Sequence, residues 1–461
     1  MKQILGIFAL AALSTAAGAQ DRETSTTIKA YAAGYKAAFT CSATFNGGKT
    51  PEMIQAQELT GIYQGFRAPM AELPDAVTDH KNKRVSVKFN DDLPPRISQW
   101  REGLGCTQLP VGADFADAQY LPSVDITRPN TSDSQPWKKL DTGSSALKAK
   151  LKSMMTDPYY GKDALTTALL VATPEELLAE EYIEGYTPKT SQRTWSVAKS
   201  IAASVIGAAV EDGMIDVGEP ANITEWQSPI DPRKNITLEN LLHMASGIDS
   251  NRAGNRTDRL YAGGGRMSDS ATEHSLDVKP GTRFKYANND TLLAVRALKN
   301  SFDSTKAYNE YPFTALLNKL GMNDTVLEID WEGNFVLSSQ VWTTSRDMAR
   351  LGILHLQDGV WNGERILPEG WVKYIATAKG PQPGPRRDGT PTMGYGAQWW
   401  LYDKNFDGIP NDAYAARGNR GQYLVVVPSR NLVLIRRGHD PAGGEGFKLD
   451  LFVRDVLKLV K

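Results

Sequence analysis

Ser196 and Lys199 form a Ser-x-x-Lys pair at the start of a stretch with helical periodicity. Residues three apart lie on the same face of a helix, so the lysine amine can reach the serine hydroxyl. An uncharged amine there can take the hydroxyl proton and turn the serine into a nucleophile. Burial and the positive end of the helix dipole both lower the pKa of a lysine in this position. The pair therefore predicts an acyl-enzyme mechanism.

The same four-residue pattern occurs a second time, at Ser145 and Lys148, so the pattern alone does not identify a nucleophile. The surroundings of the two copies differ. Ser145 lies among several lysines, which is typical of a solvated helix. Ser196 follows a predicted strand pair and opens the apolar run 201–210. We therefore take Ser196 as the candidate nucleophile.

Tyr286-Ala287-Asn288 is the only Tyr-x-Asn in the chain, and it follows a Pro-Gly turn. A phenol beside an amine can relay a proton between the nucleophile and the leaving group. In an extended backbone Asn288 points the same way as Tyr286 and is a candidate for holding a substrate carbonyl. A packed tyrosine in a surface turn is the alternative interpretation.

The segment Ala416-Arg417-Gly418-Asn419 directly precedes an apolar strand. Glycine lets the backbone approach a ligand closely, and a strand edge offers N–H groups to a substrate carbonyl. Gly418 is therefore a candidate substrate-binding residue. A glycine-rich turn without a function is the alternative.

The predicted elements around these residues mix strands and helices that are far apart in the sequence. Strands come near both ends of the larger domain, and helices come between them, which predicts an α+β sheet assembled from distant segments. The predicted strands are 167–171, 177–182, 423–427 and 432–436; the predicted helices are 196–212 and 447–460, and 215–347 is predicted to be mostly helix and loop.

The N-terminus reads as an export signal, because one lysine precedes a short apolar run and a small-x-small cleavage site. The expected organisation is a signal peptide at 1–19, an accessory N-terminal region at 20–125, a polar linker at 126–137 and a hydrolase domain at 138–461. About ten apolar residues are too few to span a bilayer, so we expect a periplasmic or secreted protein without a stable membrane anchor.

The chain has two cysteines, Cys41 and Cys106, both in the accessory region. In an oxidising compartment such a pair predicts a disulfide. In the chain-entropy model it would stabilise the region by about 4 kcal/mol. Two free buried thiols are the alternative.

The remaining composition excludes several function classes. The formal net charge of −1 favours neither nucleic acid nor an anionic membrane. None of the five histidines has metal-ligand spacing, so we expect no metal and no cofactor. The segment Asp403–Asp412 matches the first half of a calcium loop only, and His439 is expected in a solvated loop.

In this order and context, these elements resemble the serine β-lactamase and penicillin-binding-protein superfamily. The likeness is greatest to its class C-like branch of esterases, D-aminopeptidases and 6-aminohexanoate-dimer hydrolases. It extends from about Ala164 to Lys461. The stretches that carry it are Trp195–Ser200, Ile236–Gly247, Pro280–Asn288, Ala416–Asn419 and Asp358–Trp371.

The resemblance implies that Ser196 is acylated, Lys199 activates it and Tyr286 relays the proton. It also implies an oxyanion hole made by the backbone N–H groups of Ser196 and Asn419. The implied fold is α+β and β-lactamase/transpeptidase-like, with an antiparallel sheet flanked by terminal helices and a mostly helical subdomain.

The chain departs from the family at one position. Where many members have Lys-Thr-Gly or His-x-Gly, Ala416 takes the place of the cation, and Arg417 is expected on the opposite face of its strand. The missing cation favours small esters or linear amides, such as 6-aminohexanoate oligomers, as substrates. The alternatives are β-lactams or peptidoglycan peptides as substrates, or a catalytically silent binding module.

Overall fold

The computed structural model describes residues 13–61, 64–129, 136–137, 139–140, 143–250, 258–386 and 389–460. Residues 1–12 of the expected signal peptide and 130–135 of the expected linker lie outside the described residues. Within the described part, no helix is long and apolar enough to cross a membrane.

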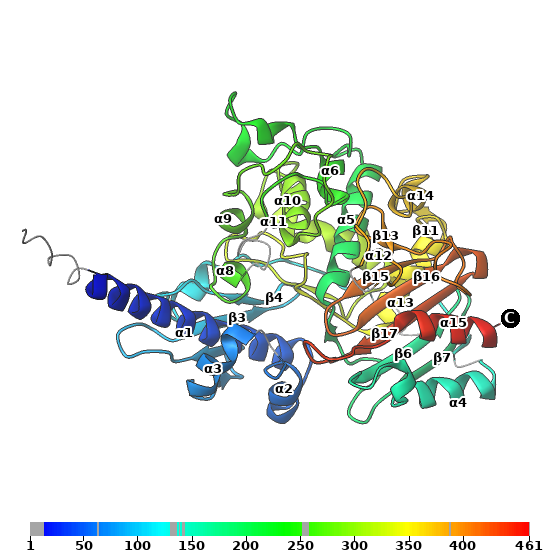
Figure 1. Ribbon diagram of the computed structural model, residues 1–461, viewed down its shortest axis with the longest axis horizontal. Coiled ribbons are helices and arrows are strands. Elements are labelled where there is room, and N and C mark those ends of the chain that lie inside the picture. The colour runs from blue at the N-terminus through cyan, green and yellow to red at the C-terminus, as the bar shows by residue number, and fades with distance from the viewer. Residues whose placement is uncertain are drawn as a thin grey trace, which may run out of the picture.

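An eight-stranded sheet forms the centre of the larger domain, in the order β13-β14-β15-β16-β17-β6-β7-β5 (Figure 1). Every neighbouring pair is antiparallel except β5 and β7, which run parallel. The strands are β5 Lys139–Leu140, β6 Thr166–Ala172, β7 Glu176–Tyr182, β13 Gly394–Tyr395, β14 Trp400–Leu401, β15 Tyr414–Gly418, β16 Gln422–Val427 and β17 Leu432–Gly438. The predicted strand pair and the predicted hairpin are thus confirmed.

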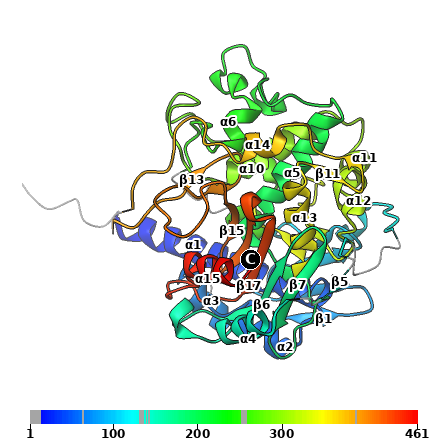
Figure 2. The ribbon, with the colours of Figure 1, turned by 90° about the vertical axis from the view of Figure 1, so that its right-hand side faces the viewer.

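Helices cover both faces of this sheet (Figure 2). On one face, the helices α4 (Ser145–Met154) and α15 (Leu449–Leu459) bury apolar side chains in a shared core. On the other face, α5 (Ala198–Glu211) and α13 (Ser345–Leu356) belong to the main core. Ser145 is exposed at the start of α4, as expected for a solvated copy of the pattern. The predicted antiparallel sheet with flanking terminal helices is confirmed.

A mostly helical subdomain lies beside one end of the sheet, in green and yellow-green in Figure 1. The stretch 215–347 was predicted to be mostly helix and loop, and its helices are short and connected by long loops. They are α6 Leu238–Leu242, α8 Asp258–Tyr261, α9 Met267–Ala271, α10 Asn288–Lys299, α11 Thr305–Pro312 and α12 Asn318–Leu320, with a π-helical turn at Phe313–Leu317. The helix α14 (Trp371–Ile375) and the hairpin β11 (Val360–Trp361) and β12 (Glu364–Arg365) follow α13.

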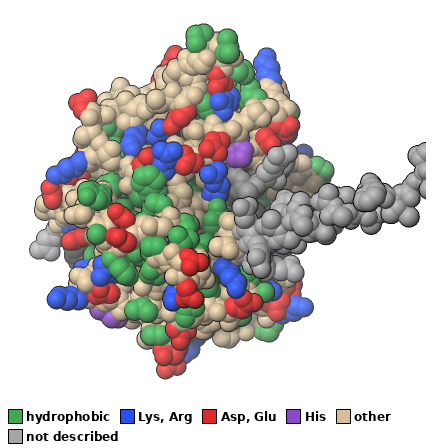
Figure 3. All heavy atoms as spheres, turned by 90° about the vertical axis from the view of Figure 1, so that its left-hand side faces the viewer, with side chains coloured by type: hydrophobic (Ala, Val, Ile, Leu, Met, Phe, Trp, Pro, Cys, Tyr) green, Lys and Arg blue, Asp and Glu red, His purple; other side chains and the backbone are tan. Residues whose placement is uncertain are grey.

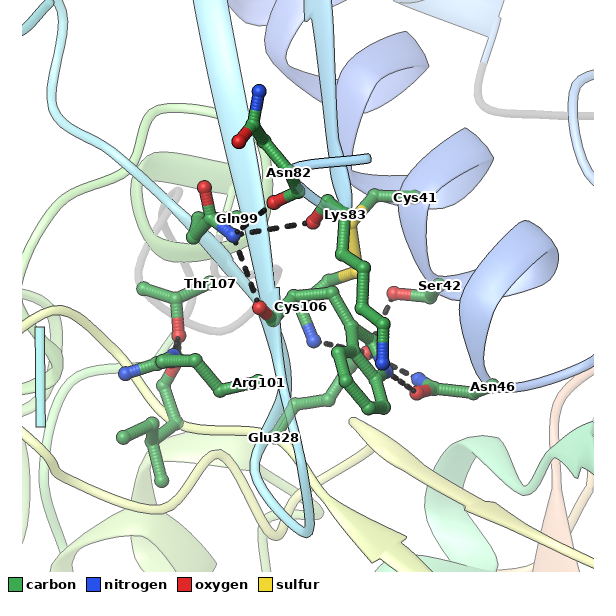
Figure 4. Close-up of a disulfide and its surroundings, with 12 residues drawn as sticks. Cys41, Ser42, Asn46, Asn82, Lys83, Gln99, Arg101, Cys106, Thr107 and Glu328 are labelled. Atoms are coloured by element: carbon green, nitrogen blue, oxygen red, sulfur yellow. Dashed lines mark hydrogen bonds between the residues drawn. A yellow bond between two sulfur atoms is a disulfide. The ribbon is translucent and has the colours of Figure 1, made fainter. Parts of the chain in front are cut away.

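In the N-terminal region, the long helix α1 packs along a four-stranded antiparallel sheet in the order β1-β2-β3-β4. The elements are α1 Leu13–Phe45, α2 Pro51–Gln57, α3 Gln64–Glu72, β1 Val77–Asp79, β2 Arg84–Val87, β3 Arg96–Arg101 and β4 Gly105–Gln108. A disulfide joins Cys41 on α1 to Cys106 on β4, with the two Cα atoms 6.1 Å apart (Figure 4). The predicted disulfide is confirmed.

Acidic and basic side chains are interspersed over the face of the molecule on the N-terminal side (Figure 3). Such mixing on this face agrees with the net charge of −1.

Candidate active site

Ser196 lies in a 3₁₀ turn, Trp195–Val197, between a short strand and a buried helix. The strand β8 (Gln192–Arg193) pairs with β10 (Val341–Thr343), which in turn pairs with β9 (Val326–Leu327). Helix α5 begins two residues later than predicted, at Ala198. It is buried on almost all sides, so the turn that carries Ser196 rests on a rigid core.

The amine of Lys199 lies 3.3 Å from the Ser196 hydroxyl oxygen and donates to two other acceptors. These are the Asn288 Oδ1 and the Ser338 carbonyl oxygen, both 2.7 Å away. A neutral amine has two hydrogens and one lone pair. With both hydrogens donated in this way, the lone pair is left for the serine O–H. Burial lowers the pKa of Lys199 to about 7, because the charged form loses its hydration.

Tyr286 completes the group of three predicted catalytic side chains. Its phenol forms a hydrogen bond with Ser196, and its ring centre lies 5.2 Å from the Lys199 amine. Burial raises the pKa of Tyr286 to about 12, although the bond with Ser196 opposes the shift. The phenol therefore keeps its proton near neutral pH and can donate it to a leaving group.

Asn288 is the first residue of α10 and not part of an extended segment, so the extended backbone expected from the sequence is wrong at this position. Its side-chain oxygen accepts a hydrogen bond from the Lys199 amine, so it orients that amine. The predicted role of Asn288 in holding a substrate carbonyl stays a prediction.

Gly418 ends β15 directly against Ser196. A Cβ atom at this position would lie 2.3 Å from the Thr194 carbonyl oxygen and 3.2 Å from the Ser196 nitrogen. Only glycine fits at such distances. The close approach brings the backbone N–H groups of Ser196 and Asn419 to the same end of the strand, where an oxyanion hole is expected.

Ser196 and Tyr286 open into a pocket with a volume of about 410 Å³. Besides these two residues, its lining comprises Pro383, Arg386, Thr392, Met393, Trp400, Arg417, Gly418, Asn419 and Tyr423. The pocket thus contains two arginines and, among its described lining residues, no acid.

Ala416 takes the place of the cation that many family members have, but Arg417 lies in the pocket. Across the β15–β16 ladder Arg417 pairs with Tyr423, and Ala416 is buried in the core beside α5, so the two side chains face opposite ways as expected. However, the pocket extends past the strand end over Tyr423 and includes Arg417. A cation is therefore present near Ser196, at a neighbouring position.

The structure also places His439 and the calcium-like segment Asp403–Asp412. His439 lies in a loop after β17, as expected, but the expectation that it is solvated is wrong: it is 6% exposed and contacts Tyr186 and Lys49. In the calcium-like segment, Asp412 accepts hydrogen bonds from Ser429. Among the described residues, no group of three or more His, Cys, Asp or Glu side chains is placed to hold a metal ion.

Two contributors to the site were missed by sequence reasoning. Ser338 acts through its backbone carbonyl, which has no side-chain signature in a sequence. Arg386 lies in a loop of prolines and glycines, where nothing in the spacing indicates the direction of a side chain.

Comparison with known proteins shows which family the chain belongs to. The sequence model of the family described as Beta-lactamase matches residues 149–454. The chain is 27% identical over 347 residues to the 6-aminohexanoate-dimer hydrolase of Paenarthrobacter ureafaciens, covering 69% of this chain and 82% of that protein.

Solved structures agree on the fold. A putative 6-aminohexanoate-dimer hydrolase from Bacillus anthracis superimposes with a TM-score of 0.53 at 21% identity, covering 72% of this chain and 86% of that one. A putative beta-lactamase from Bacteroides dorei gives a TM-score of 0.52 at 20% identity, covering 68% and 98%. From the matched stretch and the shared fold, we conclude that the chain belongs to the beta-lactamase family of hydrolases.

Proposed function

We propose that this protein is an exported serine hydrolase that cleaves small esters or linear amides through an acyl-enzyme on Ser196. The observation that carries the proposal is the Lys199 amine, which is buried, donates to the Asn288 Oδ1 and the Ser338 carbonyl, and lies 3.3 Å from the serine oxygen.

In the proposed reaction, the Ser196 oxygen attacks the substrate carbonyl carbon while its proton passes to Lys199. The backbone N–H groups of Ser196 and Asn419 stabilise the oxyanion. As the C–O or C–N bond breaks, Tyr286 gives the leaving group a proton and regains one from Lys199. Water then attacks the acyl carbon by the reverse proton route and releases Ser196 and the acid.

The linear amide substrate is proposed from a relative, because the matched protein of Paenarthrobacter ureafaciens is a 6-aminohexanoate-dimer hydrolase. The test compares p-nitrophenyl esters, the 6-aminohexanoate dimer and nitrocefin with the purified protein. We expect turnover of an ester or of the dimer. If folded protein turned over none of these compounds, the catalytically silent binding module would be favoured instead.

A second candidate substrate class is supported by the two pocket arginines, namely β-lactams or peptides with a free carboxylate. Among the described residues, neither Arg386 nor Arg417 lies within ion-pair distance of a carboxylate; their polar contacts are the Thr390 hydroxyl and the Met393 sulfur. A guanidinium presents paired N–H donors that match a carboxylate.

We predict that Arg417→Ala raises KM for a carboxylated substrate by about 10-fold, because one charge-assisted contact is lost. KM for a neutral p-nitrophenyl ester should change by less than about twofold. The matched control is Arg430→Ala, which removes the same charge at the far end of the β16–β17 hairpin. Equal effects of Arg417→Ala on both substrates would contradict the prediction.

A further inference from the structure

Two residues with left-handed backbone flank the expected oxyanion hole. Trp195, with φ of 50°, precedes Ser196, and Arg420, with φ of 57°, follows Asn419. Residues other than glycine rarely adopt positive φ, and they keep it only where the surrounding structure holds them. The two expected oxyanion donors are therefore each next to a strained residue. The contacts that hold Trp195 and Arg420 in this conformation also fix the direction of the N–H groups of Ser196 and Asn419.

The residue that holds Trp195 from the N-terminal region is Phe39 on α1. The Phe39 and Trp195 rings lie 5.9 Å apart, and both are buried. The Arg193 guanidinium lies over both rings, 3.6 Å from the centre of Phe39 and 5.4 Å from that of Trp195. Cation–π contacts of this kind are strongest when they are desolvated, as here.

Arg420 is also held by the N-terminal region. Its guanidinium donates to the backbone carbonyl of Gln57, the last residue of α2, and to the carbonyls of His439 (3.4 Å) and Asp440 (3.3 Å). The end of α2 is anchored in turn by a buried ion pair between Glu58 and Lys49, whose amine lies 3.2 Å from the His439 ring.

Helix α1 is itself fixed to the hydrolase domain at Glu328. This buried carboxylate accepts hydrogen bonds from the Ser42 hydroxyl (2.5 Å), the Asn46 amide (2.9 Å) and the Cys106 backbone N–H (3.3 Å) (Figure 4). Together with the disulfide from Cys41, these bonds set the position of Phe39 two residues earlier on the helix.

We propose that the N-terminal region shapes the oxyanion hole of the hydrolase domain. In this proposal Phe39 and Gln57 are positioning residues that hold Trp195 and Arg420 in the conformations that aim the N–H groups of Ser196 and Asn419. The region precedes the stretch 149–454 that matches the family, so it is an addition to the catalytic domain. The inference rests on the proposed catalysis at Ser196.

The first test compares Phe39→Ala with Phe45→Ala. Phe45 lies on the same helix but packs against His80 and Trp100. Because removing an oxyanion donor costs a factor of about 100 or more, we expect misdirecting one to lower kcat for a p-nitrophenyl ester by about 10-fold or more in Phe39→Ala. KM should stay within about twofold, Phe45→Ala should keep its kcat, and Phe39→Trp should recover part of the loss. An equal kcat for the two alanine variants would overturn the inference.

The second test, which decides the matter if Phe39→Ala does not fold, compares Arg420→Gly with Arg420→Ala. Both lose the contact with Gln57, but glycine adopts positive φ without strain. We expect Arg420→Gly to keep at least about 5-fold more kcat than Arg420→Ala. Equal losses would overturn the inference while leaving the proposed function intact. If the wild-type protein neither turned over an ester nor was labelled on Ser196, the proposed function would fall, and the inference with it.

Discussion

Ser196→Ala is expected to lose ester turnover by about 10⁵-fold or more, because the variant has no hydroxyl on which the proposed acyl-enzyme can form. The same variant should form no adduct with a fluorophosphonate, whereas the wild-type protein should gain one adduct on the peptide that contains Ser196. Intact-protein and peptide mass spectrometry measure both. The loss should be in kcat and in labelling, with thermal unfolding almost unchanged, since only one hydroxyl is removed.

The chain contains its own control for this experiment. Ser145 belongs to the second Ser-x-x-Lys copy, but it is exposed at the start of α4. Ser145→Ala should therefore behave like the wild-type protein in turnover and in labelling. An adduct that persists in Ser196→Ala, or that disappears in Ser145→Ala, would reject Ser196 as the nucleophile.

Lys199 is expected to give the wild-type enzyme a pH profile that rises through about pH 7. Burial lowers the pKa of Lys199 to about 7, so the amine becomes an available base above that pH. Replacement by arginine, which stays charged, should lower kcat/KM by about 10³-fold and remove this rising limb. Lys148→Arg, in the second copy, is the matched control and should change neither. If the rise of the pH profile through about pH 7 persisted unchanged in Lys199→Arg, the group that titrates there would not be Lys199.

The same pKa shift predicts a stability effect with a defined sign. The pKa of Lys199 is about 7 when folded and 10.5 at its ordinary value, so between these pH values the unfolded chain binds more protons. The free energy of unfolding should therefore rise with pH across this window. Lys199→Met lacks the group and should not show this part of the rise in chemical denaturation measured at pH 6 and pH 9.

Much of the architecture was predictable because it follows from local patterns. The apolar runs that form β6, β16 and β17 and the spacing that forms α15 read directly from the sequence. The side chains Ser196, Lys199 and Tyr286 were predicted from their chemistry together with a resemblance that spans the domain, and the structure places them in contact.

The parts that could not be predicted depend on packing between distant segments. The Ser338 carbonyl reaches Lys199 from 139 residues away, and any residue type provides a carbonyl. His439 was expected to be solvated because its buried partner, Lys49, comes from the N-terminal region and is far away in the sequence. Phe39 likewise looked like an ordinary apolar helix position, because its contact with Trp195 exists only in the folded chain.

The pairing of β17 with β6 has a consequence for how the protein acquires its structure. It joins residues 166–172 to residues 432–438, so the middle of the sheet cannot form until nearly the whole chain has been synthesised. Until then β6, which is apolar along most of its length, has one unpaired edge that invites association with other chains. Such long-range closure is slow, and the helical subdomain, whose contacts are more local, has time to fold first. The candidate active site is therefore completed late, when the β16–β17 hairpin, which lies next to β15, pairs with β6.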